Sequence, residues 1–226
     1  MIREALSGKR IAITGSTGFL GTALVERLLW AVPDCELVLL IRAGRSSTVE
    51  RRAARELFKN DAFDRLREQH GKEGCAELLE RRVQVVQGDV SSDGLGLDDA
   101  GRAALADCDI VIHSAATVSF DSPLDGAVEV NLLGPVRIVE TLHDLGVNPH
   151  LVAVSTCYVA GSRRGDAPEE LVDDSPFFVD VPWRAEVDAA RRARTDAEAE
   201  SRTPEMLAKF DKMARQESRA AGTRLL

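Results

Sequence analysis

The stretch RIAITGSTGFLG, residues 10–21, decides the fold of this chain. Its first five residues form a short apolar run with two isoleucines, which is typical of a β-strand. The glycines that follow, Gly15, Gly18 and Gly21, have the spacing G-x-x-G-x-x-G, and an amphipathic helical pattern comes directly after them. In such a turn the first glycine permits a sharp bend, the second lets the backbone approach a pyrophosphate, and the third lets the helix pack on the sheet. The stretch therefore predicts a strand, a phosphate-binding loop and a helix.

The predicted phosphate loop offers an anion the backbone N–H groups and the positive end of a helix dipole. A glycine triplet alone also fits a simple tight turn, but its place between the first strand and an amphipathic helix favours phosphate binding. The residues predicted here to bind a dinucleotide are Thr14, Gly15, Ser16, Thr17, Gly18, Phe19, Leu20 and Gly21.

Outward from this loop, apolar runs alternate with amphipathic stretches. Further strands are predicted at Glu36–Ile41, Val83–Gln87, Ile110–His113 and Leu151–Ser155. Helices are predicted at Leu20–Trp30, Val49–Phe58 and Val128–Leu142, with additional helix between residues 42 and 82. Most of the runs are apolar on both faces, as in a parallel sheet that is covered on both sides. The predicted fold class is α/β, a doubly wound parallel sheet of the Rossmann type.

The sequence pattern also predicts two parts of the chain. Residues 1–160 are expected to form the Rossmann domain, and residues 161–226 an incomplete substrate-side loop and charged helical segment. The segment from Gly161 to Trp183 is rich in Gly, Pro and acids but contains the apolar run Phe177-Phe178-Val179. A charged helical pattern follows from residue 186 to residue 219, and we expect it to break near Pro204.

Composition and charge exclude several classes of function. The 226 residues carry a net charge of −8, from 37 acidic and 29 basic side chains. The pairs Arg51-Arg52 and Arg191-Arg192 sit among acids and are interpreted as solvated helix faces, so nucleic acid is not expected as a partner. The four cysteines are scattered without a C-x-x-C pair, which is typical of a reduced protein. No apolar run approaches the ~18 residues that span a bilayer, so we expect a cytoplasmic protein without a transmembrane segment.

Two arginines after the second predicted strand indicate which dinucleotide binds. In many dinucleotide sites an acid about 20 residues beyond the glycine loop holds the ribose hydroxyls. Here Arg42 stands at that place, and Arg45 follows it. A carboxylate would repel a 2′-phosphate, whereas a guanidinium grips it with paired hydrogen bonds. NADP(H) is therefore the predicted cofactor; the alternative is that Arg42 is only a surface residue at a strand end.

Several motifs together resemble the extended short-chain dehydrogenases and, more narrowly, the fatty acyl-CoA reductases and the related thioester-reductase domains. The resemblance covers nearly the whole chain and is most specific in IHSAATVSF, residues 112–120, because the sugar epimerases of the superfamily lack the T-V-x-F part. The other stretches are TGSTGFLG (14–21), LLIR (39–42), GDV (88–90), NLLG (131–134) and VSTCYV (154–159).

The resemblance implies a role for each matching residue. Asp89 and Val90 would flank the adenine, with the Asp89 carboxylate accepting from its exocyclic amine. Asn131 would hold an active-site water and the local backbone, and Thr156 would be the catalytic hydroxyl that hydrogen-bonds the substrate carbonyl. The small side chains that would let the cofactor lie along the backbone are Ser114, Ala115, Ala116 and Thr117.

These positions also have structural interpretations. Asp89 fits a helix cap, Asn131 a buried polar group and Thr156 an ordinary β-branched strand residue. His113 is interpreted as a satisfied core histidine, and since no acid stands at metal-ligand spacing from it, no metal site is predicted. Cys157 adjoins Thr156, which allows a covalent thioester route, but core packing is favoured because no base is evident nearby.

The acid–base dyad of the resembled family is missing. That family uses Y-x-x-x-K, in which the lysine lowers the pKa of a phenol from ~10. The single tyrosine here is Tyr158, and the residue four positions later is Ser162. Two interpretations stay open: the N-terminal part of a longer reductase, truncated at the C-terminus, or a natural relative that lost catalysis. The first is favoured because the cofactor motifs and Thr156 remain.

We expect an oxidoreductase of lipid metabolism that uses NADPH to reduce a long-chain acyl-CoA or acyl-carrier thioester to fatty aldehyde, alcohol or both. Its expected partners are that thioester and the remainder of its own polypeptide. An NAD(P)-dependent sugar-nucleotide epimerase or hydroxysteroid dehydrogenase is an alternative on the same fold, and a non-catalytic NADP-binding module is another. The chain alone is expected to be inactive, with the Phe177–Trp183 apolar cluster partly exposed.

Overall fold

The computed structural model describes residues 2–44, 47–119, 121–156, 164–176 and 178–223. Its contacts divide the chain into two compact units. The first, Met1–Ser122 with Glu129–Arg164, is named the sheet unit, and the other, Pro123–Val128 with Gly165–Leu226, is named the second unit. Nothing in the sequence pattern indicated that Pro123–Val128 groups with the C-terminal helices.

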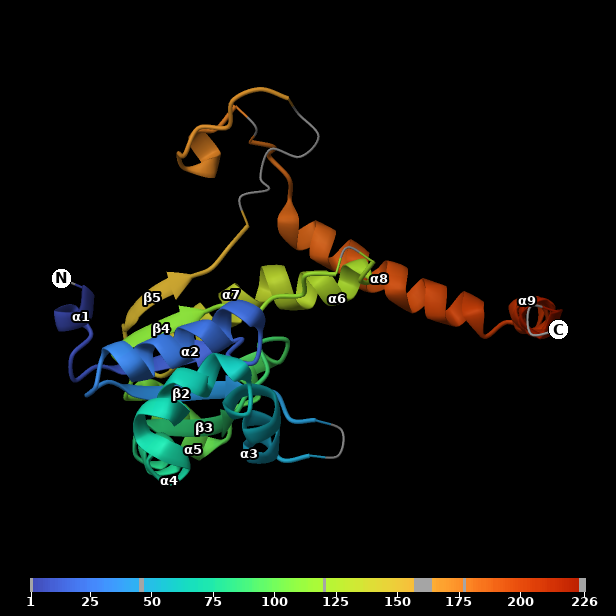
Figure 1. Cartoon of the computed structure of the whole chain (residues 1–226). Coiled ribbons are helices and arrows are strands. Elements are labelled where there is room, and N and C mark those ends of the chain that lie inside the picture. The colour runs from blue at the N-terminus through green and yellow to red at the C-terminus, as the bar shows by residue number, and fades with distance from the viewer. Residues whose placement is uncertain (1, 45–46, 120, 157–163, 177, 224–226) are drawn as a thin grey trace. The chain divides into compact units, whose positions relative to one another are not determined.

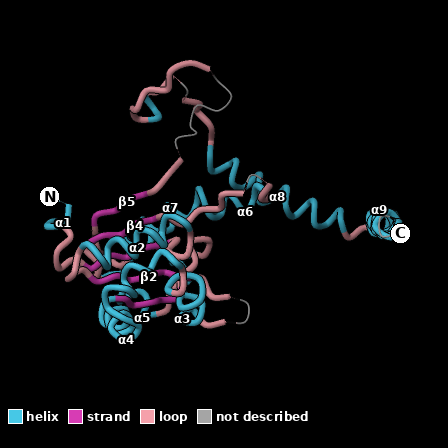
Figure 2. The backbone as a smooth tube through the Cα atoms, in the orientation of Figure 1, coloured by secondary structure: helices cyan, strands magenta, loops and turns pink. Residues whose placement is uncertain are grey.

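Five parallel strands form one sheet in the order β3-β2-β1-β4-β5. Figure 2 draws the strands in magenta and the surrounding helices in cyan. The strands are β1 (Arg10–Thr14), β2 (Glu36–Ile41), β3 (Val83–Gln87), β4 (Ile110–His113) and β5 (His150–Ala153). Strand β1, which leads into the glycine loop, is central and pairs with β2 and β4. The predicted Rossmann-type fold is confirmed; its fifth strand, predicted at 151–155, is observed at 150–153.

Helices connect the strands and cover the sheet (Figure 1). The α-helices of the sheet unit are α1 (Ile2–Ala5), α2 (Phe19–Ala31), α3 (Val49–Arg52), α4 (Asp64–Arg82), α5 (Asp99–Ala106) and α7 (Leu133–Asp144). Irregular helices are the π-helices η1 (Ala53–Phe58) and η4 (Val128–Leu132) and the 3-10 turns η2 (Asp61–Phe63) and η3 (Asp93–Gly96). The three predicted helices are confirmed, but two of them contain π-helical turns that their periodicity did not indicate.

Two apolar cores fill the two faces of the sheet. Side chains alternate along β1, so that Ile11 and Ile13 belong to one core and Ala12 belongs to the other. The first core packs β1 and β2 against α2, η1 and α4, and the second packs them against α5 and α7. Burial on both faces is what the apolar strands predicted. Because both faces of the sheet are covered, a ligand can reach it at the carboxyl ends of the strands.

A buried arginine fixes the far end of α2, the helix that starts at the glycine loop. Arg82 is 5% exposed, and its guanidinium donates to the carbonyl oxygens of Leu29 at 2.7 Å, Cys35 at 2.8 Å and Val32. These carbonyls lie in or just after the last turn of α2, where intrahelical partners run out. A positive charge at a helix C-terminus is also favourable. Arg82 therefore helps to hold in place the helix that presents the loop.

The second unit is mainly helical. Its elements are α6 (Leu124–Ala127), the 3-10 turn η5 (Val172–Asp174), α8 (Trp183–Ser201) and α9 (Pro204–Thr223). Helix α9 begins at Pro204, so the predicted break is confirmed. Proline is favoured at the first helical position because its missing N–H would have no partner there. The Thr203 hydroxyl accepts from the N–H of Met206 at 3.4 Å and caps the helix.

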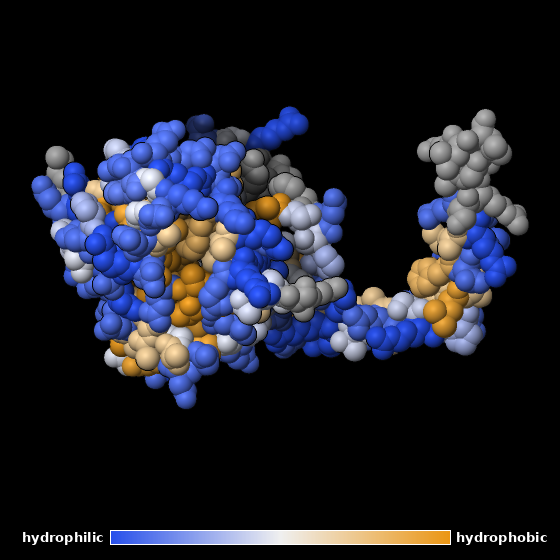
Figure 3. Space-filling model, turned by 60° about the horizontal axis from the view of Figure 1, so that its bottom comes forward, coloured by the Kyte–Doolittle hydropathy of each residue, from blue (hydrophilic) through white to orange (hydrophobic). Residues whose placement is uncertain are grey.

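Apolar side chains on α9 remain open to solvent. Its exposed hydrophobic residues are Leu207, Phe210 and Met213, and Figure 3 shows hydrophobic surface gathered on this helix. Phe178 and Val179 are also exposed, as predicted for their cluster, while Phe177 lies outside the described residues. Within the described ranges, no helix combines the length and the apolar character needed to cross a bilayer.

Candidate functional site: a cleft at the carboxyl ends of the strands

Gly15 and Gly21 allow very close backbone contacts around the glycine loop. Gly15 has a φ of +73°, in the left-handed region that favours glycine, and a Cβ there would lie 2.6 Å from the backbone nitrogen of Ala115. A Cβ on Gly21 would lie 2.1 Å from the carbonyl oxygen of Gly15. Larger residues at either position would push the loop away from β4 or from α2. The two glycines therefore create a backbone-lined cradle.

Helix α2 starts in this cradle. Its N-cap is Gly18, which has no side chain to cap the first turn, and the Gly18 N–H donates to the Gly15 carbonyl oxygen at 3.0 Å. The first N–H groups of a helix lack intrahelical partners, and a capping side chain normally satisfies one of them. A glycine cap leaves these groups to an anion, which the helix dipole also attracts.

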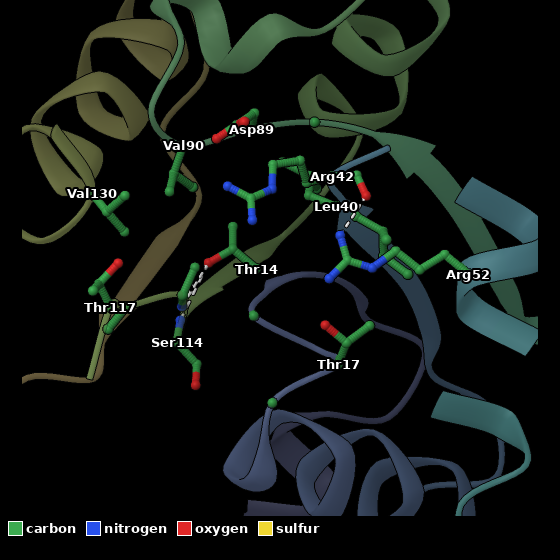
Figure 4. Close-up of a pocket in the computed structure, with 16 residues that line it drawn as sticks. Thr14, Thr17, Leu40, Arg42, Arg52, Asp89, Val90, Ser114, Thr117 and Val130 are labelled. Carbon is green, nitrogen blue, oxygen red and sulfur yellow. Dashed lines mark hydrogen bonds between the residues drawn. The ribbon is translucent and has the colours of Figure 1, made fainter. Parts of the chain in front are cut away.

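A cleft of about 250 Å³ lies beside the loop, at the carboxyl ends of β1, β2, β3 and β4 (Figure 4). The predicted residues that line it are Thr14, Gly15, Thr17, Gly18, Arg42, Asp89, Val90, Ser114, Ala115, Ala116 and Thr117. Segments far apart in the sequence therefore meet at one cleft. The lining residues that sequence reasoning missed are Leu40, Ile41, Arg52, Gly88 and Val130.

Two guanidinium groups line one part of this cleft. Arg42 directly follows β2, and its side chain reaches into the cleft in Figure 4. Arg52, from α3, donates to the Arg42 carbonyl oxygen at 2.7 Å and to the Glu56 carboxylate at 2.7 Å. The Arg52 guanidinium, and after it Arg55, lowers the pKa of Glu56. The interpretation of Arg51-Arg52 as a solvated face is wrong for Arg52, whose side chain is only 21% exposed; Arg45 lies outside the described residues.

The loop after β3 is held in a fixed shape around Asp89. One Asp89 carboxylate oxygen, Oδ1, accepts from the Ser91 N–H at 2.9 Å and from the Ser91 hydroxyl at 2.6 Å. The Asp89 N–H donates to the Leu95 carbonyl oxygen at 2.7 Å, and Leu95 itself is 1% exposed with a φ of +59°. A buried leucine in the left-handed region is strained, which burial of its side chain offsets. Among the described residues, no donor contacts the second oxygen, Oδ2.

Asn131 fixes the segment that follows β4. Its side-chain oxygen accepts from the Thr117 N–H at 2.8 Å, and its amide nitrogen donates to the Thr117 carbonyl oxygen at 2.9 Å. Asn131 lies in the π-helix η4, a form that is frequent at functional sites. Asn131 does not itself line the cleft but holds a residue that does.

Other predicted site residues lie beside the cleft rather than in it. Ser16 is 1% exposed, whereas the Phe19 side chain is 98% exposed. Leu20 is also exposed, and Gly21 packs on the loop backbone. Thr156 is exposed and follows β5 by a few residues; Cys157 and Tyr158 lie outside the described residues. The binding and catalytic roles of all these residues stay predictions.

A central parallel sheet, a glycine loop at a helix N-terminus and a cleft beside both define a Rossmann-type dinucleotide-binding protein. The family described as "Male sterility protein", a family of NAD-binding domains, matches residues 13–220. Because this match covers most of the chain, the chain belongs to that family. The predicted resemblance is confirmed: the chain is an NAD(P)-binding domain related to the fatty acyl-CoA reductases.

Its relatives include two proteins of Arabidopsis thaliana. The chain is 34% identical over 180 residues to probable fatty acyl-CoA reductase 5, covering 78% of this chain and 35% of that protein. It is 34% identical over 191 residues to fatty acyl-CoA reductase 8, covering 80% of this chain and 38% of that protein. A solved structure, the terminal R domain from the myxalamid PKS-NRPS biosynthetic pathway, matches with a TM-score of 0.56 at 26% identity, covering 73% of this chain and 39% of that one. The chain thus spans little more than a third of these relatives.

Proposed function

We propose that this chain is the NADPH-binding part of a reductase that acts on a long-chain acyl thioester, carried by CoA or a carrier protein. The observation that carries the cofactor assignment is the presence of Arg42 and Arg52 in one cleft with the glycine loop. The relationship to fatty acyl-CoA reductases supports the thioester. The product would be a fatty aldehyde, or an alcohol if a second reduction follows.

The residues of the cleft fit a dinucleotide. Gly15 and Gly21 leave a cradle that a Cβ would fill, and the N-terminus of α2 offers unsatisfied N–H groups to a pyrophosphate. The buried hydroxyl oxygen of Ser16 lacks a hydrogen-bond partner among the described residues, which is unusual for a buried polar atom. When bound, NADPH supplies the hydride. The chain's own residues bind the phosphates, accept from the adenine at Asp89 and hold the Thr117 backbone through Asn131.

Charge favours NADPH over NADH in this cleft. A phosphate on the adenosine ribose adds negative charge and acceptor oxygens, which a guanidinium binds in a fork. Arg42 makes no ion pair within the described parts of the chain, so its charge is available. Arg52 already pairs with Glu56 but keeps its place in the cleft lining. We therefore assign the 2′-phosphate to Arg42, with Arg52 beside it.

Arg42→Ala tests this assignment. Losing one charge-assisted hydrogen bond should weaken NADPH binding by roughly 10- to 150-fold and leave NADH binding nearly unchanged. Arg51→Ala is the matched control, because Arg51 is an exposed arginine on the neighbouring helix α3 and does not line the cleft. Isothermal titration calorimetry with both cofactors measures the difference. Equal losses for NADPH and NADH would make Arg42 a general structural residue.

In this proposal Thr156 supplies the hydroxyl that hydrogen-bonds the carbonyl oxygen of the thioester. The reaction also needs a proton donor, and general acid catalysis contributes typically 10²–10⁴-fold. Because Tyr158 is not followed by lysine at Ser162, residues 1–226 alone should not oxidise NADPH with a long-chain acyl-CoA. The absorbance of the reduced nicotinamide measures this oxidation directly. Clear thioester-dependent oxidation would contradict this prediction and return Tyr158 and Cys157 to consideration as the catalytic group.

A further inference from the structure

The last residues of β1 and β4 meet in a buried hydrogen bond. Thr14 and His113 are partners in the strand register, and Thr14 Oγ1 lies 2.7 Å from His113 Nδ1. Both side chains are enclosed, with exposed fractions of 2% for Thr14 and 4% for His113. The sequence alone indicated only that His113 is a core residue. Its partner, however, is the first residue of the glycine loop.

Hydrogen-bond accounting fixes the direction of this contact. Thr14 Oγ1 also accepts from the N–H groups of Ser114 and Ala115, each at 3.3 Å. A hydroxyl has one hydrogen and two lone pairs, so both lone pairs are taken. The hydroxyl hydrogen must then point to His113 Nδ1. His113 is therefore neutral, with its proton on Nε2, and burial lowers the pKa of His113 in agreement.

This arrangement lies where two walls of the cleft meet. Thr14 and Gly15 line the cleft from the loop, and Ser114 and Ala115 line it from the end of β4. Gly15 already approaches Ser114 so closely that a Cβ on Gly15 would lie 2.7 Å from the Ser114 carbonyl oxygen. The Thr14 hydroxyl joins the two walls (Figure 4). The Ser114 N–H has a second acceptor, the Thr14 carbonyl oxygen at 3.3 Å, so turning the hydroxyl would free the Ala115 N–H and weaken the connection between the walls.

We propose that His113 is a positioning residue for nucleotide binding: by accepting from the Thr14 hydroxyl, it holds the phosphate loop in register with the segment after β4. The inference rests on the proposed nucleotide site but adds a residue that does not line the cleft. A dinucleotide that spans both walls must find them at a fixed separation. His113 sets that separation through Thr14 without touching the ligand.

Paired substitutions test the hydrogen bond rather than the volume of the side chain. Thr14→Val keeps the shape and removes the hydroxyl, whereas Thr14→Ser keeps the hydroxyl. His113→Phe removes the acceptor, whereas the amide oxygen of His113→Asn can stand where Nδ1 stood. We expect NADPH binding to weaken about tenfold in Thr14→Val and His113→Phe, and less than about threefold in the two conservative variants. The double variant Thr14→Val/His113→Phe should bind no more weakly than Thr14→Val alone, because His113 acts only through the Thr14 hydroxyl.

A control separates positioning from stability. Val111 is buried in the same core, two residues before His113, and Val111→Ala should lower the free energy of unfolding without changing the Kd for NADPH. If the Kd rises as much in Val111→Ala as in His113→Phe, the role of His113 is only structural. Unchanged Kd values in folded His113→Phe and Thr14→Val overturn the proposal. Absence of NADPH binding by the wild-type chain instead overturns the proposed function.

A measurement on the wild-type chain covers the case in which the variants do not fold. Nitrogen-15 NMR distinguishes the two neutral tautomers of histidine. At neutral pH the His113 Nδ1 resonance should be that of an unprotonated acceptor, with the proton on Nε2. A protonated Nδ1 would mean that the Thr14 hydroxyl accepts from His113 and is not oriented by it. That result would overturn the proposal on its own.

Discussion

The sheet unit and the second unit use their apolar side chains in opposite ways. In the sheet unit, residues such as Ile13 in the first core and Val111 in the second are almost completely enclosed. In the described part of the second unit, the buried apolar residues are Val187 and Ala190 of α8, while Phe210 on α9 is about half exposed. The comparison indicates that a backbone fixed by packing on both faces, as in the sheet unit, is what a preformed phosphate cradle needs.

A glycine-to-valine change should therefore weaken NADPH binding strongly in the phosphate loop of the sheet unit and hardly at all in the second unit. Gly18→Val places a branched side chain where the pyrophosphate must lie and should weaken NADPH binding about 1,000-fold or more, equivalent to about 4.1 kcal/mol. Gly126→Val in α6 is the control, because nothing lies within 4 Å of a Cβ at that position. It should leave the Kd within about twofold. Calorimetry with far-ultraviolet circular dichroism checks both; tight binding by Gly18→Val would mean that the cofactor does not lie over this turn.

Leucine-to-alanine changes compare how much a side chain of each unit contributes to the free energy of unfolding. Leu57 in η1 is 0% exposed, and Leu57→Ala should lower the free energy of unfolding by about 3 kcal/mol, as cavities in packed cores do. Leu207 on α9 is 55% exposed, and Leu207→Ala should change that free energy by less than about 0.5 kcal/mol. Urea denaturation measures both. A loss in Leu207→Ala as large as that in Leu57→Ala would show that α9 is buried in solution.

The smallest expected effect is the change in the free energy of unfolding with pH that the titration of His113 causes. Burial lowers the pKa of His113 from its ordinary value of 6.5, so the unfolded chain binds a proton more readily than the folded chain. The contribution of His113 to stability is complete above about pH 6.5 and is lost as the pH falls below it, by at most about 1.4 kcal/mol per pH unit. Denaturation at about pH 7.5 and about pH 5.5 measures this loss, which His113→Asn should reduce. An equal loss in the variant would assign it to other groups.

The sequence predicts best what depends on local periodicity and on glycine geometry. The run at residues 10–14 and the three glycines after it predicted β1, the loop and α2, because a sharp turn and a close helix contact leave few other choices. The fifth strand was placed slightly late because β-branched residues continue past Ala153, where the ladder ends. The segment 49–58 was predicted helical, but the π-helical turn at Ala53–Phe58 depends on tertiary packing, which periodicity does not report.

The parts of the site that the sequence did not reveal depend on contacts between distant segments. Arg52 stood in a charged pair at the start of a helix, and only the fold brings it to the Arg42 carbonyl. His113 was interpreted as a core residue because its partner, Thr14, is 99 residues earlier in the sequence and becomes its neighbour only through strand pairing. Asn131 was expected to hold backbone, and the fold identifies that backbone as Thr117.

Titration of the wild-type chain with NADPH and with NADH, at equal pH and ionic strength, tests the central claim most directly. The claim is that the sheet unit carries a dinucleotide site whose arginines select the 2′-phosphate. The account predicts that NADPH binds at least about tenfold more tightly than NADH, since the two cofactors differ only in that phosphate. Raising the salt concentration should narrow the difference, because exposed charges are screened. Equal affinities, or tighter binding of NADH, would contradict the account.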